Sequence, residues 1–174
     1  MTDKGKNEPT IAERLAAPFY ADEVEWKIQS TTKDKKRALV VPYIKARALM
    51  QRLDDAVGIE NWTDTYEEVG DGFNCALSIR INGEWVTKND AAEHVVMTVY
   101  DDGTRSTIKS LKGTYSGAFK RVCTTWGIGR YLYDIPRRWV PIDEKKKFTT
   151  PVLAPNFYPE DATKQGFRPG SKVE

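Results

Sequence analysis

The chain has 174 residues, of which 40% are hydrophobic and 30% charged, and its formal net charge is +2. This length predicts one domain with a tail, and the hydrophobic fraction is sufficient for a core, which excludes a wholly disordered chain. No run of about 18 apolar residues is present, the first ten residues are polar, and neither cysteine belongs to a Cys/His cluster. The sequence therefore predicts no membrane span, no secretory signal, no disulfide framework and no structural zinc site.

The charge is unevenly distributed along the chain. Residues 1–47 carry a net charge of +3, residues 48–102 carry −9, residues 103–147 carry +8, and residues 148–174 are neutral. A basic stretch can bind phosphates even in a chain that is almost neutral overall. An acidic face that docks on a basic face, within one chain or between copies, is equally compatible with this pattern.

The first elements are short. Thr10 and Glu13 have capping-box spacing, which predicts a helix from Ile11 to Phe19 that Pro18 limits to about two turns. A short strand is expected over residues 25–29, followed by a polar, basic turn. The apolar, β-branched run 38–43 predicts a second strand. Its proline, Pro42, indicates an edge strand or a strand end.

A helix and a β-meander are expected next. Apolar residues recur at helical spacing from Ile44 to Val57, and Gly58 is a typical glycine beyond a helix end. Alternation then predicts strands over residues 62–69, 73–81 and 84–88. The turn between the first two is Gly70-Asp71-Gly72, and Asn82-Gly83, a strong hairpin signal, separates the last two. Residues 95–100 are either a fourth strand or an ordered excursion.

A long helix closes the predicted core. Its apolar stripe consists of Ile108, Leu111, Tyr115, Ala118, Phe119, Val122, Cys123 and Trp126, and Gly127 ends it. The fold class is therefore predicted to be α+β, with a β-β-β-α core preceded by a helix. We expect a functional domain at residues 1–147. Residues 148–174 contain four of the nine prolines, which predicts a flexible tail.

No catalytic constellation is recognisable. The single histidine, His94, has no motif partner, and a packed or surface role is favoured. Adjacent acids on a strand, such as Glu67 and Glu68, point to opposite faces and cannot converge on a metal pair. The glycines of Gly127-Ile128-Gly129 follow a helix, whereas a phosphate loop follows a strand, so they indicate helix termination. We therefore expect neither an enzyme nor a cofactor, metal or ATP requirement.

Basic and aromatic residues on and near the long helix are the main candidates for function. Lys109, Lys112 and Lys120 lie along its predicted flank, with Arg121 behind them. Aromatic side chains are available for base stacking, although core packing is favoured for Tyr115 and Trp126; the candidates are Tyr43, Tyr115, Trp126, Tyr131 and Tyr133. A cationic groove interleaved with aromatics is typical of proteins that bind single strands without sequence choice.

Three segments resemble a known family. They are KGTYSGAFKRVCTTWGIGRYLYD (residues 112–134), VPYIKARALMQRLDDAVGIENW (residues 41–62) and LAAPFYADEVEWKIQ (residues 15–29). These blocks resemble the Rad-fifty-two superfamily of single-strand DNA annealing proteins, in its phage Sak-type branch. The similarity covers roughly residues 11–140, and the family's order of helix, meander and long helix matches the order predicted from the pattern.

The resemblance implies an oligomeric ring or helical arc that binds single-stranded DNA in a basic groove and pairs complementary strands without ATP, in recombination and repair. The family's basic groove positions match Lys120, Arg121 and Arg47, with Lys45 adjacent. Lys112 and Arg130 are secondary candidates for contact with the DNA backbone. A third basic position of the family's helix falls on Thr124, which is a departure. The lysines of the outer DNA site found in eukaryotic members cannot be carried over, because the corresponding turn is Asn82-Gly83; the candidate substitutes are Lys88, Arg105 and Lys109.

Two alternatives remain open at this stage. One is an interaction module whose tail recruits a recombinase or a single-strand-binding protein. The other is a metal-dependent nuclease, against which the scattered carboxylates argue. The expected location is the cytoplasm of a bacterium or of a phage-infected cell.

Overall fold

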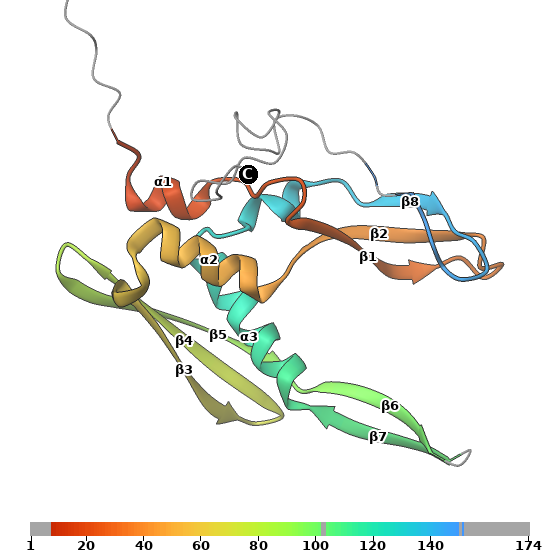
Figure 1. Cartoon of the computed structure of the whole chain (residues 1–174). Coiled ribbons are helices and arrows are strands. Elements are labelled where there is room, and N and C mark those ends of the chain that lie inside the picture. Colours follow the sequence, from red (N-terminus) through yellow and green to blue (C-terminus); the bar gives the residue numbers. More distant parts are fainter. Residues whose placement is uncertain (1–7, 102–103, 150, 152–174) are drawn as a thin grey trace, which may run out of the picture. The chain divides into compact units, whose positions relative to one another are not determined.

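The computed structural model describes residues 8–101, 104–149 and 151. The elements, in chain order, are α1 (Ile11–Ala16), β1 (Val24–Thr31), β2 (Arg37–Ile44), α2 (Ala46–Val57), the 3-10 helix η1 (Ile59–Asn61), β3 (Trp62–Val69), β4 (Gly72–Ile81), β5 (Glu84–Glu93), β6 (Val95–Asp101), β7 (Thr104–Ser110), α3 (Leu111–Thr125), the 3-10 helix η2 (Arg130–Asp134) and β8 (Arg138–Pro141) (Figure 1). The described strands form three antiparallel sheets, in the orders β1-β2-β8, β3-β4-β5 and β6-β7. The predicted α+β class is confirmed.

The chain divides into two compact units. The first contains Leu49–Ile128 together with the described residues before Ala17. The second contains Ala17–Ala48 together with the described residues after Ile128. Helix α2 begins in the second unit and continues in the first.

The first unit contains the predicted meander. Strands β3 and β4 pair from Trp62↔Ile79 to Val69↔Gly72, and β4 and β5 pair along their whole lengths. The β4–β5 turn is tight because Asn82 and Gly83 both have positive φ, 52° and 87°, the conformation that suits a two-residue hairpin. The third strand extends five residues beyond its predicted end at residue 88, because its pairing with β4 continues to Glu93.

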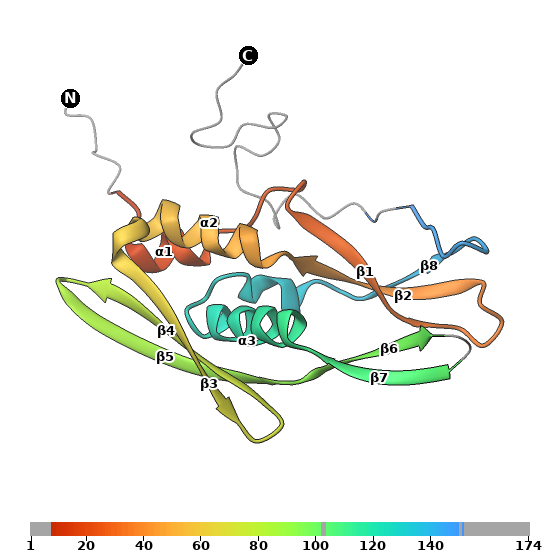
Figure 2. The ribbon, with the colours of Figure 1, turned by 60° about the horizontal axis from the view of Figure 1, so that its bottom comes forward.

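Helix α3 packs on β4 and β5 (Figure 2). Alternation places three buried side chains of β4 on one face, and spacing of three and four residues forms a buried stripe on α3. These residues are Cys75, Leu77 and Ile79 on the strand, and Thr114, Ala118, Phe119, Val122 and Cys123 on the helix. A Cβ added at Gly117 would lie 3.3 Å from the Ala92 side chain, so a glycine here allows the helix to approach β5 closely. The β-β-β-α core is confirmed.

The long helix begins later than predicted. Ser110 is its N-cap and accepts a hydrogen bond from the Gly113 N–H at 3.2 Å, which defines the first turn. Residues 104–110 form β7 instead, so the assignment of Ile108 and Lys109 to the helix was wrong. Leu111, also predicted on the apolar stripe, is 56% exposed. Residues 95–101 are a strand, but they pair with β7 in a separate hairpin and do not add a fourth strand to the meander.

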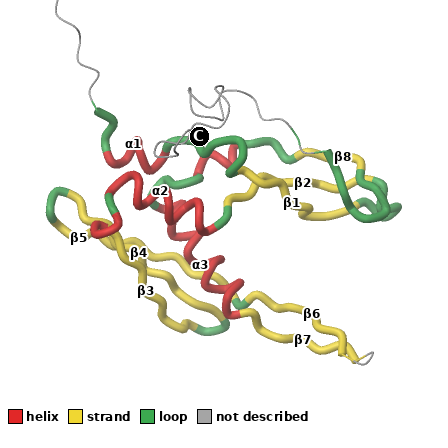
Figure 3. Tube along the Cα trace, in the orientation of Figure 1, coloured by secondary structure: helices red, strands yellow, loops and turns green. Residues whose placement is uncertain are grey.

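The sheet of the second unit joins residues that are far apart in sequence. Strand β2 is central, with β1 on one side and β8 on the other (Figure 3). The prediction that Pro42 indicates an edge strand was therefore wrong for the strand as a whole. Strand β8 pairs only with Arg37–Val40, so Pro42 lies where β2 has a single partner and its missing N–H is tolerated.

The N-terminal helix has its predicted cap. The Thr10 N–H donates to the Glu13 carboxylate at 2.8 Å, and the Glu13 N–H donates to the Thr10 hydroxyl at 3.2 Å. The helix ends at Ala16 rather than at Phe19, because the residue before a proline disfavours helical geometry. Of the predicted tail, all but residues 148, 149 and 151 lie outside the described residues.

Candidate nucleic-acid interface

Aromatic packing fixes α3 on the meander. The Tyr115 ring stacks on Phe73 at 4.5 Å between centroids and meets the edge of Tyr66 at 4.6 Å. At the other end, the Trp126 indole N–H donates to the Leu77 carbonyl at 3.2 Å. Tyr115 and Trp126 are thus both part of the packing of α3, which is the role that the sequence favoured for them.

A lysine of β5 also supports the C-terminal end of α3. The Lys88 ammonium donates to the Thr125 carbonyl at 2.9 Å and lies 4.5 Å from the Trp126 ring centroid. A cation at a helix C-terminus is stabilised by the unsatisfied carbonyls there. Lys88 is therefore engaged with the helix end.

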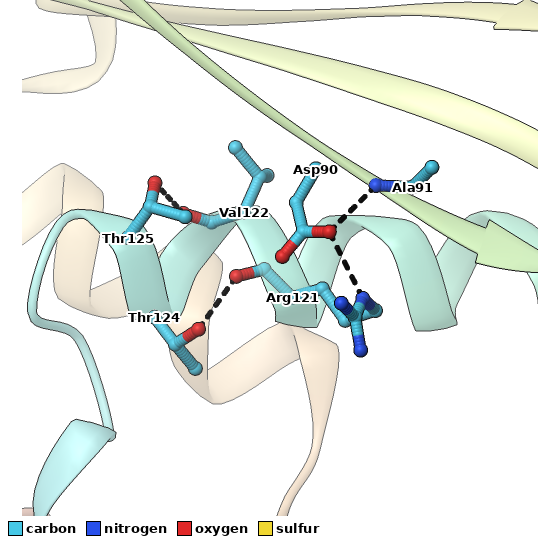
Figure 4. Close-up of polar contacts among 6 residues, drawn as sticks. All are labelled: Asp90, Ala91, Arg121, Val122, Thr124 and Thr125. Carbon is cyan, nitrogen blue, oxygen red and sulfur yellow. Dashed lines mark hydrogen bonds and ion pairs between the residues drawn. The ribbon is translucent and has the colours of Figure 1, made fainter.

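Arg121 lies next to a carboxylate that sequence reasoning missed. Its Nε donates to Asp90 Oδ1 at 3.0 Å, and the same oxygen accepts the Ala91 N–H at 2.8 Å (Figure 4). The Arg121 side chain is 58% exposed, and a guanidinium has five N–H donors. Donors other than Nε are therefore available for a phosphate. The sequence did not indicate this contact because the third strand was predicted to end at residue 88, and Asp90 lies beyond that point.

The other two α3 candidates differ in their position on the helix. Lys112 is exposed and Lys120 is half-buried. At about 100° per residue, position 120 faces away from the buried stripe, position 121 lies beside its edge, and position 112, seven residues before Phe119, lies on the same side as Phe119. Lys120 thus faces outward, with Lys112 and Arg121 on the two flanks of α3 instead of in one row. Thr124, at the family's third basic position, donates its hydroxyl to the Arg121 carbonyl at 2.7 Å.

The remaining three predicted residues belong to the second unit. Lys45 follows β2, and its ammonium pairs with the Glu25 carboxylate at 2.5 Å. Arg47 is exposed in the first turn of α2, and Arg130 is exposed at the start of η2. Lys45 and Arg47 are thus neighbours at one junction, whereas Arg130 lies on a separate element. The six predicted residues form two groups, one on each unit, and their contact with DNA remains a prediction.

The aromatic candidates of the second unit have different environments. The Tyr131 hydroxyl accepts the Phe19 N–H at 3.0 Å, and Lys27 lies 3.3 Å from the Tyr43 ring centroid. Tyr133 is 77% exposed. Of these three, Tyr133 has the most accessible ring for stacking.

The buried ionisable groups serve packing. Burial raises the pKa of the Cys75 thiol to about 11 and raises the pKa of Cys123 further. Burial also raises the pKa of Tyr66, whose hydroxyl donates to Asp64 at 2.7 Å. The side chain of His94 is buried against Phe73, with the rings 5.5 Å apart.

The described part of the chain contains neither a candidate metal cluster nor a candidate membrane-spanning helix. No group of three or more His, Cys, Asp or Glu residues there could hold a metal ion. None of the helices described is long and apolar enough to cross a membrane. The predicted glycine role is confirmed, because Gly127 follows the end of α3 with a φ of 91°, and Gly129, with a φ of 68°, is the N-cap of η2.

Comparison with known proteins identifies the family. Residues 7–149 match the Rad52/22 family of double-strand break repair proteins. The chain belongs to this family. The superfamily predicted from the three segments is confirmed, and all three lie within the matched region. The Sak-type branch remains a prediction.

Two similar proteins are both named DdrA, from species of Deinococcus. The chain is 35% identical over 147 residues to the single-stranded DNA-binding protein DdrA of Deinococcus deserti. This alignment covers 84% of this chain and 67% of the relative. It is 32% identical over 137 residues to DdrA of Deinococcus radiodurans. This second alignment covers 79% of this chain and 61% of that relative. The aligned regions account for most of this chain and about two thirds of the length of each relative.

Proposed function

We propose that this protein binds single-stranded DNA and anneals complementary strands without ATP, acting as a homo-oligomeric ring or arc in recombination and repair. Family membership and the two DNA-binding relatives support the binding. Residues 1–147 would form the binding and oligomerising region, and residues 148–174 a tail that could dock a recombinase or a single-strand-binding protein.

The observation that carries the proposal is the outward side of α3. Lys120 lies there, flanked by Lys112 and Arg121, within the segment that resembles the family's signature. The opposite side of the helix is fixed on the sheet by fully buried residues such as Phe119 and Val122. A rigid helix that presents cations in fixed positions can hold a phosphate backbone without a large ordering cost.

The mechanism follows from charge neutralisation. Lysine and arginine side chains that contact phosphates release counterions and reduce the repulsion between two strands. A bound strand whose backbone faces the protein leaves its bases accessible, and a second strand can then sample registers until enough base pairs form. No covalent bond is made or broken, so the process needs neither a nucleophile nor a general base.

Assembly is proposed to use the uneven charge of the chain. The acidic residues of the meander would meet a basic surface of a neighbouring subunit. Attraction between exposed charges weakens as salt rises. Both DNA binding and oligomerisation are therefore expected to decrease with increasing salt.

The test is annealing of two complementary dye-labelled oligonucleotides with neither ATP nor metal. Wild-type protein should accelerate annealing, and Lys120→Ala/Arg121→Ala should bind single strands roughly 5- to 25-fold more weakly at 0.1 M salt, as expected for one or two lost phosphate contacts. The matched control is Arg14→Ala/Arg80→Ala, which removes the same charge from exposed positions of the same unit. Light scattering should show that all variants assemble alike.

The same experiment can contradict the proposal. If wild-type protein binds strands but does not accelerate their annealing, the annealing activity is wrong. If the Lys120/Arg121 variant binds as tightly as the control, the α3 surface is not the binding surface.

A further inference from the structure

One end of the β1-β2-β8 sheet gathers basic residues from two distant segments. The β1–β2 turn and the turn after β8 lie side by side, because Arg37 pairs with Pro141 and the Ile142 N–H donates to the Lys36 carbonyl at 3.0 Å (Figure 3). We call the exposed cations of these two turns the basic tip: Lys33, Lys35, Lys36, Arg37, Lys145, Lys146 and Lys147.

Two acidic residues of these turns, Asp34 and Asp143, hold the backbone, and a third, Glu144, is exposed beside Lys145. The Asp34 carboxylate accepts from the Thr32 hydroxyl at 2.6 Å and from the Lys36 N–H at 3.1 Å, which lowers the pKa of Asp34. The Asp143 carboxylate accepts the Lys147 N–H at 2.7 Å. Within the described part of the chain, no lysine of the basic tip forms an ion pair. The carboxylates thus shape the turns and leave the ammonium groups exposed.

Two of the lysines occupy backbone conformations that disfavour side chains. Lys35 and Lys146 have φ of 55° and 58°, in the left-handed region where glycine is favoured. The β4–β5 turn shows the usual solution, an asparagine followed by a glycine. At the basic tip a lysine occupies this left-handed conformation in both turns. Both turns therefore carry a positive charge at a position where glycine would cost less conformational energy.

An exposed aromatic side chain adjoins the basic tip. Trp139 is 45% exposed and pairs with Leu39, and its carbonyl accepts from Arg37 Nη2 at 3.3 Å. Three adjacent strands span about 10 Å, so cations from both turns can contact neighbouring phosphates of one strand. Cations beside an exposed indole suit a strand whose phosphates are neutralised and whose bases can stack.

We propose that the basic tip and Trp139 form a nucleic-acid-binding surface that contacts the phosphate backbone of a single strand, on a different unit from α3. The proposal rests on the proposed function, because it assumes that the protein handles single-stranded DNA. Lysines act as point charges without base readout, so binding at this surface is independent of sequence.

The test variant is Lys35→Gly/Lys146→Gly, which removes two charges and suits the backbone at both positions. Binding of a fluorescent oligothymidine is measured by anisotropy over a series of salt concentrations. At 0.1 M salt we expect affinity to fall roughly 5- to 25-fold and the slope of log K against log salt to decrease by about 1.4. The melting temperature should stay the same or rise. Arg14→Ala/Arg80→Ala again controls for net charge.

The outcomes separate this proposal from the proposed function. If wild type binds and the glycine variant binds equally well with the same salt slope, the basic tip is not a DNA surface, whatever α3 does. If the glycine variant loses affinity while Lys120→Ala/Arg121→Ala does not, the basic tip is supported and the α3 surface is overturned. If wild type does not bind, both fail. If the glycine variant loses assembly and retains DNA affinity, the surface contacts an acidic face of another copy, and the proposal is wrong.

Discussion

The two three-stranded sheets are alike in architecture and opposite in charge. Residues 62–93, which form β3-β4-β5, include seven acidic and two basic residues. The strands and turns of β1-β2-β8, at residues 24–44 and 138–147, include nine basic and four acidic residues. A net charge of +2 for the chain conceals this separation. We therefore expect anions to bind at particular surfaces of this protein rather than to the chain as a whole.

The sheets also differ in how their strands come together. Each strand of β3-β4-β5 pairs with its neighbour in sequence through a turn of two residues. Strand β8, in contrast, pairs with β2 across about one hundred residues. Because local pairing is encoded in adjacent alternation and turn residues, the meander was predictable. The distant pairing that assembles the basic tip was not.

The largest expected effect is a loss of stability in the first unit, which contains the meander and α3. Phe119 is 1% exposed between α3 and the sheet and lies 6.2 Å from Trp62. Phe119→Ala should lower the free energy of unfolding by about 3–5 kcal/mol, because it leaves a cavity in a packed core. Urea unfolding measures this loss, and Phe19→Ala is the matched change in the second unit. A loss below 1 kcal/mol for Phe119→Ala would show that α3 is not packed as described.

Alkaline pH should act selectively on the same unit, which contains both cysteines. The pKa of Cys75 is raised from 9.0 to about 11, so between these values the unfolded state loses a proton that the folded state keeps. Stability is therefore complete below pH 9 and falls as pH rises toward 11, by at most about 2–3 kcal/mol for this thiol. Urea unfolding between pH 8 and 10.5 measures the slope. Cys75→Ala should make the slope shallower without abolishing it, because burial also raises the pKa of Cys123 in the same unit. An equally steep slope in that variant would exclude the Cys75 thiol as a cause.

The smallest expected effect is on single-strand affinity and comes from removing one acidic charge of the β3-β4-β5 sheet. Asp90→Asn retains an oxygen for the Ala91 N–H but removes the negative charge beside Arg121. Because an exposed ion pair is weak, single-strand affinity should rise only about 2- to 5-fold, with little change in stability. Anisotropy titration at low salt measures it. A decrease in affinity would indicate that Asp90 instead orients Arg121 for binding.

Much of the candidate site could be predicted from the sequence. Lys112, Lys120 and Arg121 lie on α3 as expected, because apolar spacing fixes which side of a helix is buried. The helix start was misplaced, since Ile108 continues the apolar spacing while pairing places it in β7. Asp90 was missed because exposed residues late in β5 show no hydrophobic alternation.

The sequence by itself determined the family, the meander, the capping of α1 and the cationic helix. These depend on periodicity, turn residues and contiguous motifs, which are local properties of the chain. Only the tertiary structure decided that β2 is central, that Arg121 meets Asp90, and that the lysines of residues 33–37 and 145–147 share one end of a sheet. Each of these requires a pairing between distant segments, and such a pairing is selected by packing and hydrogen bonding across the whole fold.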